Sequence, residues 1–489
     1  MNLYVSLIHL LPEAMLLIPA LGIIAVSVAC AGKSNADGTT MLLATFGIIA
    51  AIITSVTVPL DATIGGDLLC NDALARIVRP WVFALALPAV LVAPKRHHLV
   101  HAGEFTALLL FGLIGLSLAA CSRHLLMLFT GLELAGLSFY ILTGFSRTRQ
   151  AADAAIRYFL FGGVAAAFLL FGCSLVYGFA PALTFTGIAL ASGTGGIPLF
   201  ASLGLLMILV GLCFKLAAAP FHFWAPDVYQ KAPVAAATLI SAASKITALV
   251  VMVRLLLTAF PALAGNACWG QWQAGWALWL AIIAAVSMIL GNLLALGQKS
   301  VRRLLAYSAV ANAGYALIGI VAGGVAAMAT ALHYIIIYGL ATAGALIVTA
   351  IVEARTGSDD MRSFSGMWRK SPGMAIAMVV FMGSLAGLPP MAGFAGKFAL
   401  FSQALNVAGA GLTWLVGIAV VMSAVSLYYY LSVLRRVMEE PKQTTAYEKL
   451  ELGPNAAMLV TAAGVVVLGV FPSLLLSPLA SALFHGVIR

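Results

Sequence analysis

Apolar residues run along this chain in long blocks that are separated by short polar connectors. A helix needs about 20 predominantly apolar residues to cross the hydrocarbon core of a bilayer. Fourteen blocks are close to that length or longer, and they predict membrane spans at residues 7–30, 39–59, 77–94, 104–121, 123–145, 154–179, 200–225, 233–260, 274–296, 301–322, 325–353, 373–405, 410–434 and 456–478. The pattern therefore predicts an all-α polytopic membrane protein with about 14 transmembrane helices.

The composition excludes an ordinary water-soluble protein. Of the 489 residues, 63% are hydrophobic and only 9% are charged, whereas charged residues make up about a quarter of soluble proteins. A formal charge of +10 would suggest nucleic acid binding in a soluble protein, but here most basic residues lie in the connectors. The first block carries Glu13 and lacks both a basic start and an evident cleavage site, so it is predicted to be a retained helix and not a signal peptide.

The basic residues are distributed unequally between the two sets of connectors. The connectors after odd-numbered spans, counted with the span ends next to them, hold 17 Lys and Arg residues, and the opposite set holds four, including Arg76 and Arg79. The positive-inside rule places the richer set in the cytoplasm. Because the number of spans is even, both termini are expected on the outer side. The remaining five basic residues fall within spans: Arg157, Lys215, Lys245, Arg254 and Lys397.

Prolines interrupt the seventh and twelfth spans. In GLCFKLAAAPFHFWAPD, Pro220 removes the amide that would otherwise bind the carbonyl of Leu216. In GSLAGLPPMAGFAGKF, Pro389 and Pro390 free the two carbonyls that lie four residues before them. Freed carbonyls at membrane depth are tolerated only where protein or water satisfies them. Two broken spans therefore indicate a hydrated path.

The two broken spans occupy equivalent places in a candidate repeat. The seventh is the fourth of spans four to eight, and the twelfth is the fourth of spans nine to thirteen. Tandem units with an odd number of spans have opposite orientations, so the pattern predicts two inverted five-helix repeats, as in many secondary transporters. The predicted division is an N-terminal three-helix segment, a first repeat, a second repeat, and a C-terminal loop with helix 14, over residues 1–103, 104–260, 274–434 and 435–489.

Ionisable residues inside spans call for a partner or a function, because a charge at the bilayer centre costs at least about 2.5–3.5 kcal/mol on insertion scales. Glu133 lies half-way along LFTGLELAGLSFYIL, and Lys215 lies just before the first proline break. A Glu133–Lys215 pair would relieve both costs. Lys245, in LISAASKITALV, and Lys397, shortly after the second break, extend the set. Together they predict a chain of titratable groups that crosses the protein parallel to the membrane.

Proton transfer is the chemistry that suits such a chain. Burial disfavours the charged form of an ionisable group, and a nearby opposite charge favours it. A site whose proton affinity depends on the distance to its partner can therefore load from one side and release to the other. His222, seven residues after Lys215, is a candidate relay because imidazole titrates near neutral pH. A structural hydrogen bond to a freed carbonyl is an equally good interpretation of His222.

Other polar residues within the spans have simpler interpretations. Arg157 lies one turn into its span, where Asp153 stands at the spacing of a helical salt bridge. Arg254 lies close to the outer end of its span, where a headgroup or a structural salt bridge is the better interpretation. For His333, packing is slightly favoured over a role in proton transfer.

Metal and redox sites find no support in the sequence. The six cysteines are scattered without a CxxC or CxxCH motif, and no GxGxxG follows a strand. A histidine cluster, His97, His98 and His101, has no acidic or cysteine ligands nearby. We therefore predict no metal site and no redox centre in this chain.

Three segments carry a resemblance to a known family: GLCFKLAAAPFHFWAPDVYQKAPVAAATLISAASK, GNLLALGQKSVRRLLAYSAVANAGY and SLAGLPPMAGFAGKF. Over nearly its whole length the chain resembles the antiporter-like membrane-arm subunits of respiratory complex I, the proton-pumping NADH:quinone oxidoreductase. The FHFWAPDVYQ form, the lysine at position 397 and the end after 14 spans resemble the bacterial N-type members of that family.

The resemblance implies one proton-translocating module of a translocase, with NADH, FMN, iron–sulfur clusters and quinone bound by other subunits. Glu133 and Lys215 would form a coupled pair, Lys245 the connecting lysine and Lys397 the exit-side lysine, with His222 just after the first break. Each repeat would hold one proton half-channel, and quinone reduction elsewhere would drive transfer. The implied partners are antiporter-like and small membrane-arm subunits of a bacterial inner membrane, with both termini periplasmic.

Two residues depart from the family pattern. Arg157 stands where many relatives carry a lysine, and a guanidinium is hard to deprotonate. Asn312 stands where a related SSxSHLGY pattern has histidine, which argues against a relay through the tenth span.

Two alternatives remain open. A subunit of a multi-subunit cation/proton antiporter shares the fold and the lysines, and sodium-dependent transport without NADH-linked activity would favour it. A scaffold whose charges only hold helices together predicts that charge-neutral double changes at Glu133 and Lys215 preserve function.

Overall fold

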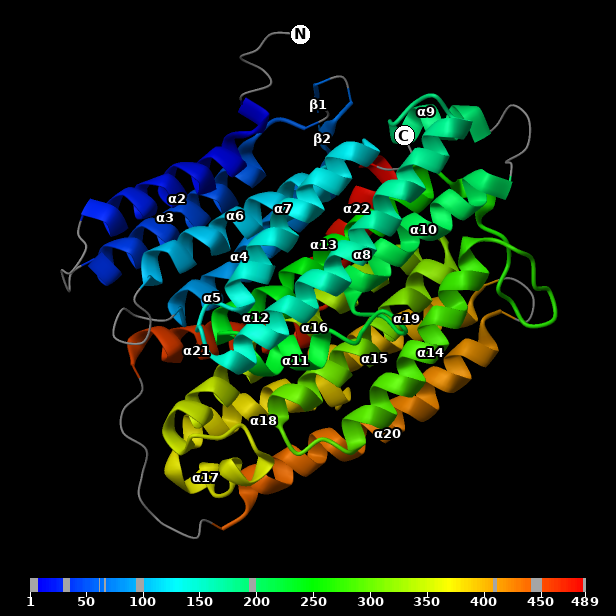
Figure 1. Cartoon of the computed structure of the whole chain (residues 1–489). Helices are drawn as coiled ribbons and strands as arrows, with labels where there is room; N and C mark the ends of the chain where they lie inside the picture. The colour runs from blue at the N-terminus through cyan, green and yellow to red at the C-terminus, as the bar shows by residue number, and fades with distance from the viewer. Residues whose placement is uncertain are drawn as a thin grey trace.

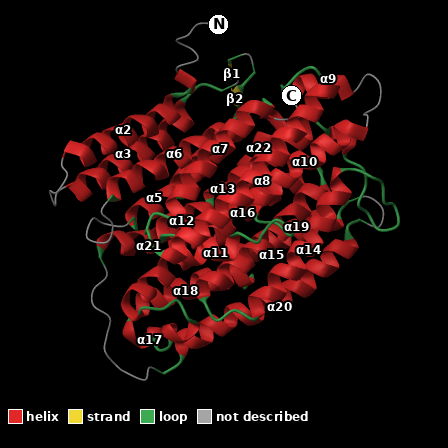
Figure 2. Ribbon diagram, in the orientation of Figure 1, coloured by secondary structure: helices red, strands yellow, loops and turns green. Residues whose placement is uncertain are grey.

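The computed structural model describes residues 8–29, 36–60, 62–65, 67–93, 101–192, 199–407, 411–440 and 451–486. Helices with roughly parallel axes make up nearly all of this part, and short loops join them (Figures 1 and 2). The N-terminal segment contains α2 (Leu11–Ala29), α3 (Ala36–Thr57), the antiparallel hairpin of β1 (Ala62–Ile64) and β2 (Leu69–Asn71), α4 (Ala73–Ala84) and α5 (Ala86–Leu91).

Two longer groups of helices follow. The first contains α6 (Ala102–Ala120), α7 (Leu125–Thr143), α8 (Arg149–Phe179), α9 (Phe185–Ser192), α10 (Leu199–Leu216), α11 (Ala225–Lys231), α12 (Val234–Ser241) and α13 (Ala243–Thr258). The second contains η1 (Pro261–Leu263), α14 (Trp276–Leu296), α15 (Val301–Ala322), α16 (Gly324–Thr356), η2 (Met361–Phe364), α17 (Met367–Lys370), α18 (Pro372–Ala386), α19 (Ala392–Leu405) and α20 (Thr413–Met438). The chain continues through α21 (Leu452–Val470) and α22 (Ser473–Gly486). In Figure 1, α2 and α3 lie at one edge of the bundle and α20 at the opposite edge.

The predicted all-α membrane architecture is confirmed. Within the described residues, thirteen helices are long and apolar enough to cross a membrane. The one predicted span that is not among these thirteen is the twelfth, which is present as the two shorter helices α18 and α19.

Four details differ from the prediction. The third span divides into α4 and α5, because Pro88 cannot donate to the carbonyl of Ala84. The eighth divides into α12 and α13 at Ala242. The last span ends at Val470, before Pro472, and α22 follows separately. The short helix α9 was not predicted.

Glycines bring the first two helices of each long group into backbone contact. A Cβ atom on Gly115 of α6 would lie 2.5 Å from the amide nitrogen of Ala135 in α7. A Cβ atom on Gly291 of α14 would lie 2.4 Å from the amide nitrogen of Ala311 in α15. Small residues permit such close approach of helices in lipid, where van der Waals packing drives their association. The α6–α7 and α14–α15 pairs therefore share one mode of packing.

Buried ion pairs hold the N-terminal segment together and, with a hydrogen bond, attach it to the rest of the bundle. Arg79 of α4 donates from Nη2 to both carboxylate oxygens of Glu13 in α2, at 2.6 and 2.7 Å. Ser117 of α6 donates to the same carboxylate at 2.5 Å. Arg254 of α13 donates to both oxygens of Asp72, at 2.5 and 2.6 Å, and Asp72 also caps the start of α4. These contacts fix α4 against α2, α6 and α13.

These pairs correct one part of the sequence analysis. Arg76 and Arg79, counted there in a connector, lie inside α4, because this helix begins at Ala73 after the Asp72 cap. The Arg79 side chain is buried with Glu13 as its partner. The salt bridge considered for Arg254 is confirmed, with Asp72 as its partner.

Substituting Arg79 by Met is expected to lower the free energy of unfolding by about 3–5 kcal/mol, because it leaves the Glu13 carboxylate buried without its cation. Thermal melting of the purified protein measures this effect. Arg76→Met on the same helix is the matched control, since the Arg76 side chain is more exposed and, among the described residues, hydrogen-bonds only to the Val56 carbonyl, at 2.7 Å. Equal melting of the two variants would contradict a structural role for the Arg79–Glu13 pair.

Candidate functional site

Glu133 and Lys215 form an ion pair between α7 and α10. The Lys215 Nζ lies 3.6 Å from Oε1 of Glu133 and donates to the Leu132 carbonyl at 3.3 Å. The Lys215 side chain is 7% exposed and that of Glu133 is 22% exposed. The pair proposed from the sequence is therefore present in the structure, and the lysine is its more deeply buried member.

A glycine on α7 makes room for this ammonium group. A Cβ atom on Gly136 would lie 2.7 Å from the Lys215 Nζ. Gly136 follows Glu133 by three residues, and residues at that spacing share a helix face. The carboxylate and the space for its partner are thus encoded on one face of α7. The ring of Tyr140 completes this side, with its centroid 5.6 Å from Nζ.

Helix α10 ends, directly after Lys215 and Leu216, in a Schellman motif. Ala217 has a positive φ of 57° and donates to the Phe214 carbonyl at 3.0 Å. Ala218 donates to the Cys213 carbonyl at 2.9 Å. These are the two hydrogen bonds that define the motif. The peptide bond before Pro220 is cis, and the chain resumes as α11.

Helix α18 ends in the same way. Gly387 has a φ of 83° and donates to the Ser384 carbonyl at 3.0 Å, and Leu388 donates to the Gly383 carbonyl at 2.9 Å. The peptide bond before Pro390 is cis, and α19 follows. The two predicted breaks therefore share one backbone design, with proline at the same distance after the left-handed residue.

Lys245 binds the carbonyl that the first break leaves free. Its Nζ donates to the Leu216 carbonyl at 2.7 Å and to the Ala309 carbonyl of α15 at 2.8 Å. The ring of Tyr338, on α16, lies 5.7 Å from the same nitrogen. Lys245 is fully buried in the first turn of α13, just after the interruption of the eighth span.

Lys397 has the same role at the second break. Its Nζ lies 3.3 and 3.4 Å from the carbonyls of Leu385 and Ala386, which Pro389 and Pro390 leave without amide partners. It also donates to Ser423 of α20 at 3.1 Å. A cation is favoured at the C-terminal end of a helix, where carbonyl dipoles point outward. Both broken helices thus end against a buried lysine.

The two candidate histidines are buried, and each retains free hydrogen-bonding capacity. His222 lies in the turn between α10 and α11, stacked on Phe223 with centroids 4.8 Å apart. Its Nδ1 has no hydrogen-bond partner among the described residues. His333 lies in α16, and neither of its ring nitrogens has a partner in the described part of the chain. No hydrogen bond joins His333 to the lysines among the described residues.

Arg157 binds across the bundle and not along its own helix. Its Nη1 lies 3.0 Å from Asp227 of α11, and Arg303 of α15 binds the other oxygen of Asp227 at 3.0 Å. The structural salt bridge expected for Arg157 is therefore present, but its partner is Asp227 and not Asp153, the partner suggested by the sequence. Asp227 lies in α11, after the break in the seventh span, and it binds the guanidinium groups of Arg157 from α8 and Arg303 from α15.

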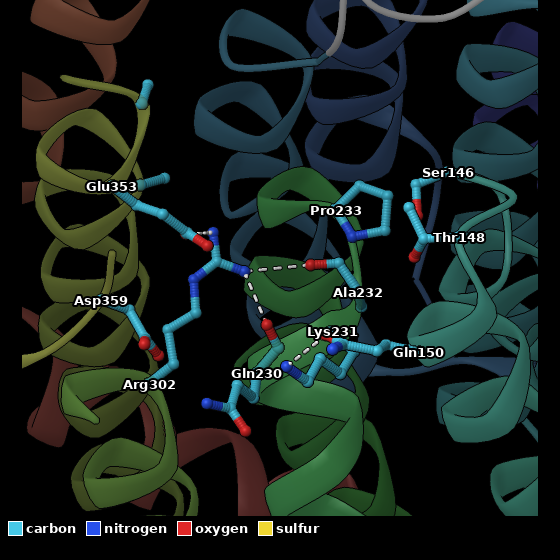
Figure 3. A pocket seen from close by; sticks show the side chains of 12 residues that line it. Ser146, Thr148, Gln150, Gln230, Lys231, Ala232, Pro233, Arg302, Glu353 and Asp359 are labelled. Atoms are coloured by element: carbon cyan, nitrogen blue, oxygen red, sulfur yellow. Dashed lines mark hydrogen bonds and ion pairs between the residues drawn. The ribbon is translucent and has the colours of Figure 1, made fainter. Parts of the chain in front are cut away.

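A polar cavity of about 460 Å³ lies where the basic connectors meet the ends of α11, α15 and α16 (Figure 3). Arg302 binds Glu353 at 2.6 Å and the Ala232 carbonyl at 3.1 Å, and Lys231 binds Gln150 at 2.7 Å. The lining residues are Ser146, Thr148, Gln150, Gln230, Lys231, Ala232, Pro233, Arg302, Ala350, Glu353, Ala354 and Asp359. The cavity adjoins the start of the eighth span, which carries Lys245 further along.

The sequence analysis missed a buried hydrogen-bonded group beside Lys397. We call it the amide–tyrosine cluster; it consists of Asn292, Ser308, Asn312, Tyr315, Tyr334, Tyr429 and Tyr430. The Tyr315 ring centroid lies 5.0 Å from the Lys397 Nζ. The available signal was an amide inside each of two apolar runs, GNLLALGQ and AVANAGY. The sequence pattern singled out Asn312 only as a replacement for a histidine, and it gave no reason to connect this residue with Asn292.

Among the described residues, no group of three or more His, Cys, Asp or Glu side chains is arranged to hold a metal ion. His97 and His98 lie outside the described residues. The arrangement as a whole offers ammonium, carboxylate, imidazole and hydroxyl groups inside a membrane bundle, which are groups that hold and transfer protons.

Comparison with known proteins identifies relatives over most of the chain. Residues 122–426 match the family described as the NADH:quinone oxidoreductase/Mrp antiporter transmembrane family. NADH-quinone oxidoreductase subunit N 2 of Acidobacterium capsulatum is 41% identical over 450 residues, which cover 89% of this chain and 90% of that protein. Subunit N of Trichlorobacter lovleyi is 36% identical and covers 96% of both chains.

Solved structures give the same result. A chain of respiratory complex I from Thermus thermophilus is 30% identical, with a TM-score of 0.78 over 96% of this chain and all of that one. A chain of the Mrp complex from Dietzia sp. superposes with a TM-score of 0.83 over 98% of both chains, and at 20% identity this likeness concerns the fold.

Substitutions at the two left-handed positions are expected to have unequal effects. Gly387→Ala places a side chain where φ is positive and 3.3 Å from the Lys397 side chain, so it should destabilise by about 1–2 kcal/mol. Ala217→Gly should be nearly neutral, because relief of the same backbone cost offsets the loss of a buried methyl group. Melting temperatures of the two purified variants provide the test, and equal destabilisation would contradict the shared design.

Proposed function

Because the chain belongs to the NADH:quinone oxidoreductase/Mrp antiporter family of membrane proteins, we propose that it is a proton-translocating membrane-arm subunit, of the N type, in a bacterial NADH:quinone oxidoreductase. It is one subunit of a translocase, and it works beside other membrane-arm subunits. NADH, FMN, the iron–sulfur clusters and quinone belong to other subunits of that complex. The chain is a multi-pass protein of the inner membrane.

The observation that carries this proposal is the position of the buried ammonium groups. Lys245 and Lys397 bind the free carbonyls at the two helix breaks, and Lys215 lies one residue before the first of these carbonyls. A charge at membrane depth is costly enough that such a residue is by default a functional one. Three lysines at two breaks, with one carboxylate at the beginning, form a directed series.

The proposed route starts at the Glu133–Lys215 pair. A change in the separation of this pair, driven by quinone reduction elsewhere in the complex, alters how strongly Lys215 holds its proton. The proton then moves to Lys245, with His222 as the relay beside the first break, and on to Lys397 for release. Each charge moved against the membrane potential costs about 2.3 kcal/mol per 100 mV. Arg157 and His333 are supporting residues and do not carry the proton.

The repeats belong to the same proposal. The identical ends of α10 and α18 and the glycine contacts of α6–α7 and α14–α15 support two inverted five-helix units. Residues 104–260 and 274–434 then form the two units, each with one half-channel, after an N-terminal segment over 1–103 and before a C-terminal segment over 435–489. The cavity lined by Arg302 serves as access from the cytoplasm, and both termini face the periplasm.

A subunit of a multi-subunit cation/proton antiporter is the alternative within the same family. Its fold and its buried lysines do not separate it from the proposed function. The identity to subunit N proteins over most of the chain favours the oxidoreductase. Sodium-dependent transport by the purified complex, without NADH-linked activity, would favour the antiporter.

Lys397→Ala is expected to reduce NADH-driven proton uptake into vesicles, together with quinone-linked turnover, to about a tenth or less, since a proton-transferring group typically contributes about 10²–10⁴-fold. Proton uptake is measured in membranes where the complex is first shown to be assembled. Lys299→Ala, an exposed lysine in a basic connector, is the matched control and should leave both activities unchanged. Full pumping by the Lys397→Ala complex would refute the route.

The double variant Glu133→Gln with Lys215→Gln distinguishes proton transfer from a scaffold role. Removing both charges leaves no unpaired ion, so the helices should still pack and the complex should assemble. Proton uptake should nevertheless be lost, because neither amide can accept or release a proton near neutral pH. A pumping double variant would make the pair structural.

A further inference from the structure

Asn292 ties two tyrosines together beside Lys397. Its Nδ2 donates to the Met288 carbonyl at 2.7 Å and to the Tyr315 hydroxyl at 3.2 Å. Its Oδ1 accepts from the Tyr429 hydroxyl at 3.0 Å. An amide has two donor hydrogens and an acceptor oxygen, and here both ends of the side chain are engaged. Asn292 itself is fully buried.

Asn312 occupies a similar position on the other side of the cluster. Its Nδ2 donates to the Ser308 carbonyl at 2.7 Å and approaches the Tyr430 hydroxyl at 3.4 Å. Its Oδ1 accepts from the Tyr334 hydroxyl, and Ser308 and Tyr430 bind each other through their hydroxyls. Each of the seven side chains of the amide–tyrosine cluster thus has at least one hydrogen-bond partner within the cluster.

The cluster lies between Lys397 and the side of the basic connectors. Asn292 is near the end of α14 that leads to Lys299, and Tyr429 and Tyr430 lie within two turns of Arg435 on α20. At about 1.5 Å per residue, these positions are roughly 6–14 Å from the helix ends. Tyr315 completes the contact to the Lys397 ammonium group.

The surroundings of Lys215 and Lys245 are different. Two buried polar atoms beside these lysines have no hydrogen-bond partner within the described residues: Nδ1 of His222, in the turn after α10, and Oγ1 of Thr247, two residues after Lys245. Among the described residues, every side-chain nitrogen and oxygen atom of the amide–tyrosine cluster has at least one hydrogen-bond partner. Free buried donors and acceptors are where ordered water binds in proteins, so water has partners around Lys245 and few within the cluster.

On the side of the basic connectors, the cavity lined by Arg302 measures about 460 Å³ (Figure 3), and no residue of the amide–tyrosine cluster lines it. A cavity lined by Asn312, Tyr334 and Ser384, beside the cluster, measures about 10 Å³. That is room for about one water molecule, which cannot form a continuous chain.

We propose that the amide–tyrosine cluster is a proton barrier that prevents Lys397 from exchanging protons with the side of the basic connectors. A proton passes along hydroxyl groups only if each group can accept one proton and give up another. The two amides interrupt this exchange, because an asparagine side chain neither gains nor loses a proton near neutral pH. The proton on Lys397 then leaves only toward the opposite side. This inference rests on the proposed function and adds to it the direction in which Lys397 releases its proton.

The test is the passive proton permeability of the complex in liposomes without NADH. Asn292→Asp keeps the size of the side chain and adds a titratable oxygen between Tyr315 and Tyr429. An imposed pH gradient should decay several-fold faster through this variant, and with NADH fewer protons should accumulate per NADH oxidised. Asn312→Asp is the second variant, with the same expected result.

Gln298→Glu is the matched control, because it makes the same amide-to-carboxylate change just after α14 but outside the cluster. It should leave the gradient as stable as in the unsubstituted complex. If the pH gradient persists as long in an aspartate variant as in the control, the proposed barrier is wrong. It is also wrong if the unsubstituted complex, without NADH, leaks protons faster than protein-free liposomes do. This readout needs no pumping, so it is distinct from a failure of the proposed function, which the Lys397→Ala assay reports.

Discussion

A helix that breaks inside a membrane leaves carbonyl groups that lipid cannot satisfy, and the arrangement of this protein follows from how those groups are bound. The ends of α10 and α18 each meet a buried lysine, whose ammonium group donates to the carbonyls that proline has freed. The dependence is mutual, because the carbonyl dipoles also lower the cost of burying the cation. Break and lysine therefore form a single unit, and a group that titrates is held at membrane depth by ordinary backbone chemistry.

The two breaks share a backbone but differ in their surroundings. The lysine at the end of α10 comes from the following span, whereas the lysine at the end of α18 comes from the second half of the same span. The first break also carries Lys215, which pairs with Glu133. At the second break, the position equivalent to Lys215 is occupied by Leu385. A repeated fold with identical sites at both breaks would give transfer no preferred direction. The side-chain differences supply the asymmetry that the shared backbone lacks.

Much of this was predictable from the sequence, because its strongest signals are physical constraints of the bilayer. Apolar block length predicted the spans, proline predicted the breaks, and the cost of buried charge selected Glu133, Lys215, Lys245 and Lys397. Contacts between distant segments were not predictable in the same way. Arg157 forms its ion pair with Asp227 and not with Asp153, because α11 places Asp227 within reach of the guanidinium group. The Arg79–Glu13 pair depends on α4 starting at Ala73, a boundary that hydropathy alone does not define.

The amides were the least predictable of the polar residues, because an uncharged group in an apolar run costs too little to stand out. Their significance appears only when hydrogen bonds are counted across four helices. Beside the first break and Lys245, Nδ1 of His222 and Oγ1 of Thr247 have no partner, whereas every side chain of the amide–tyrosine cluster has at least one among the described residues. A proton carrier needs groups that can bind water in one place and groups that exclude it in another. A path open to water along its whole length would conduct protons in either direction. Hydrogen bonding among buried side chains, usually considered a contribution to stability, is in this proposal also a means of excluding a proton.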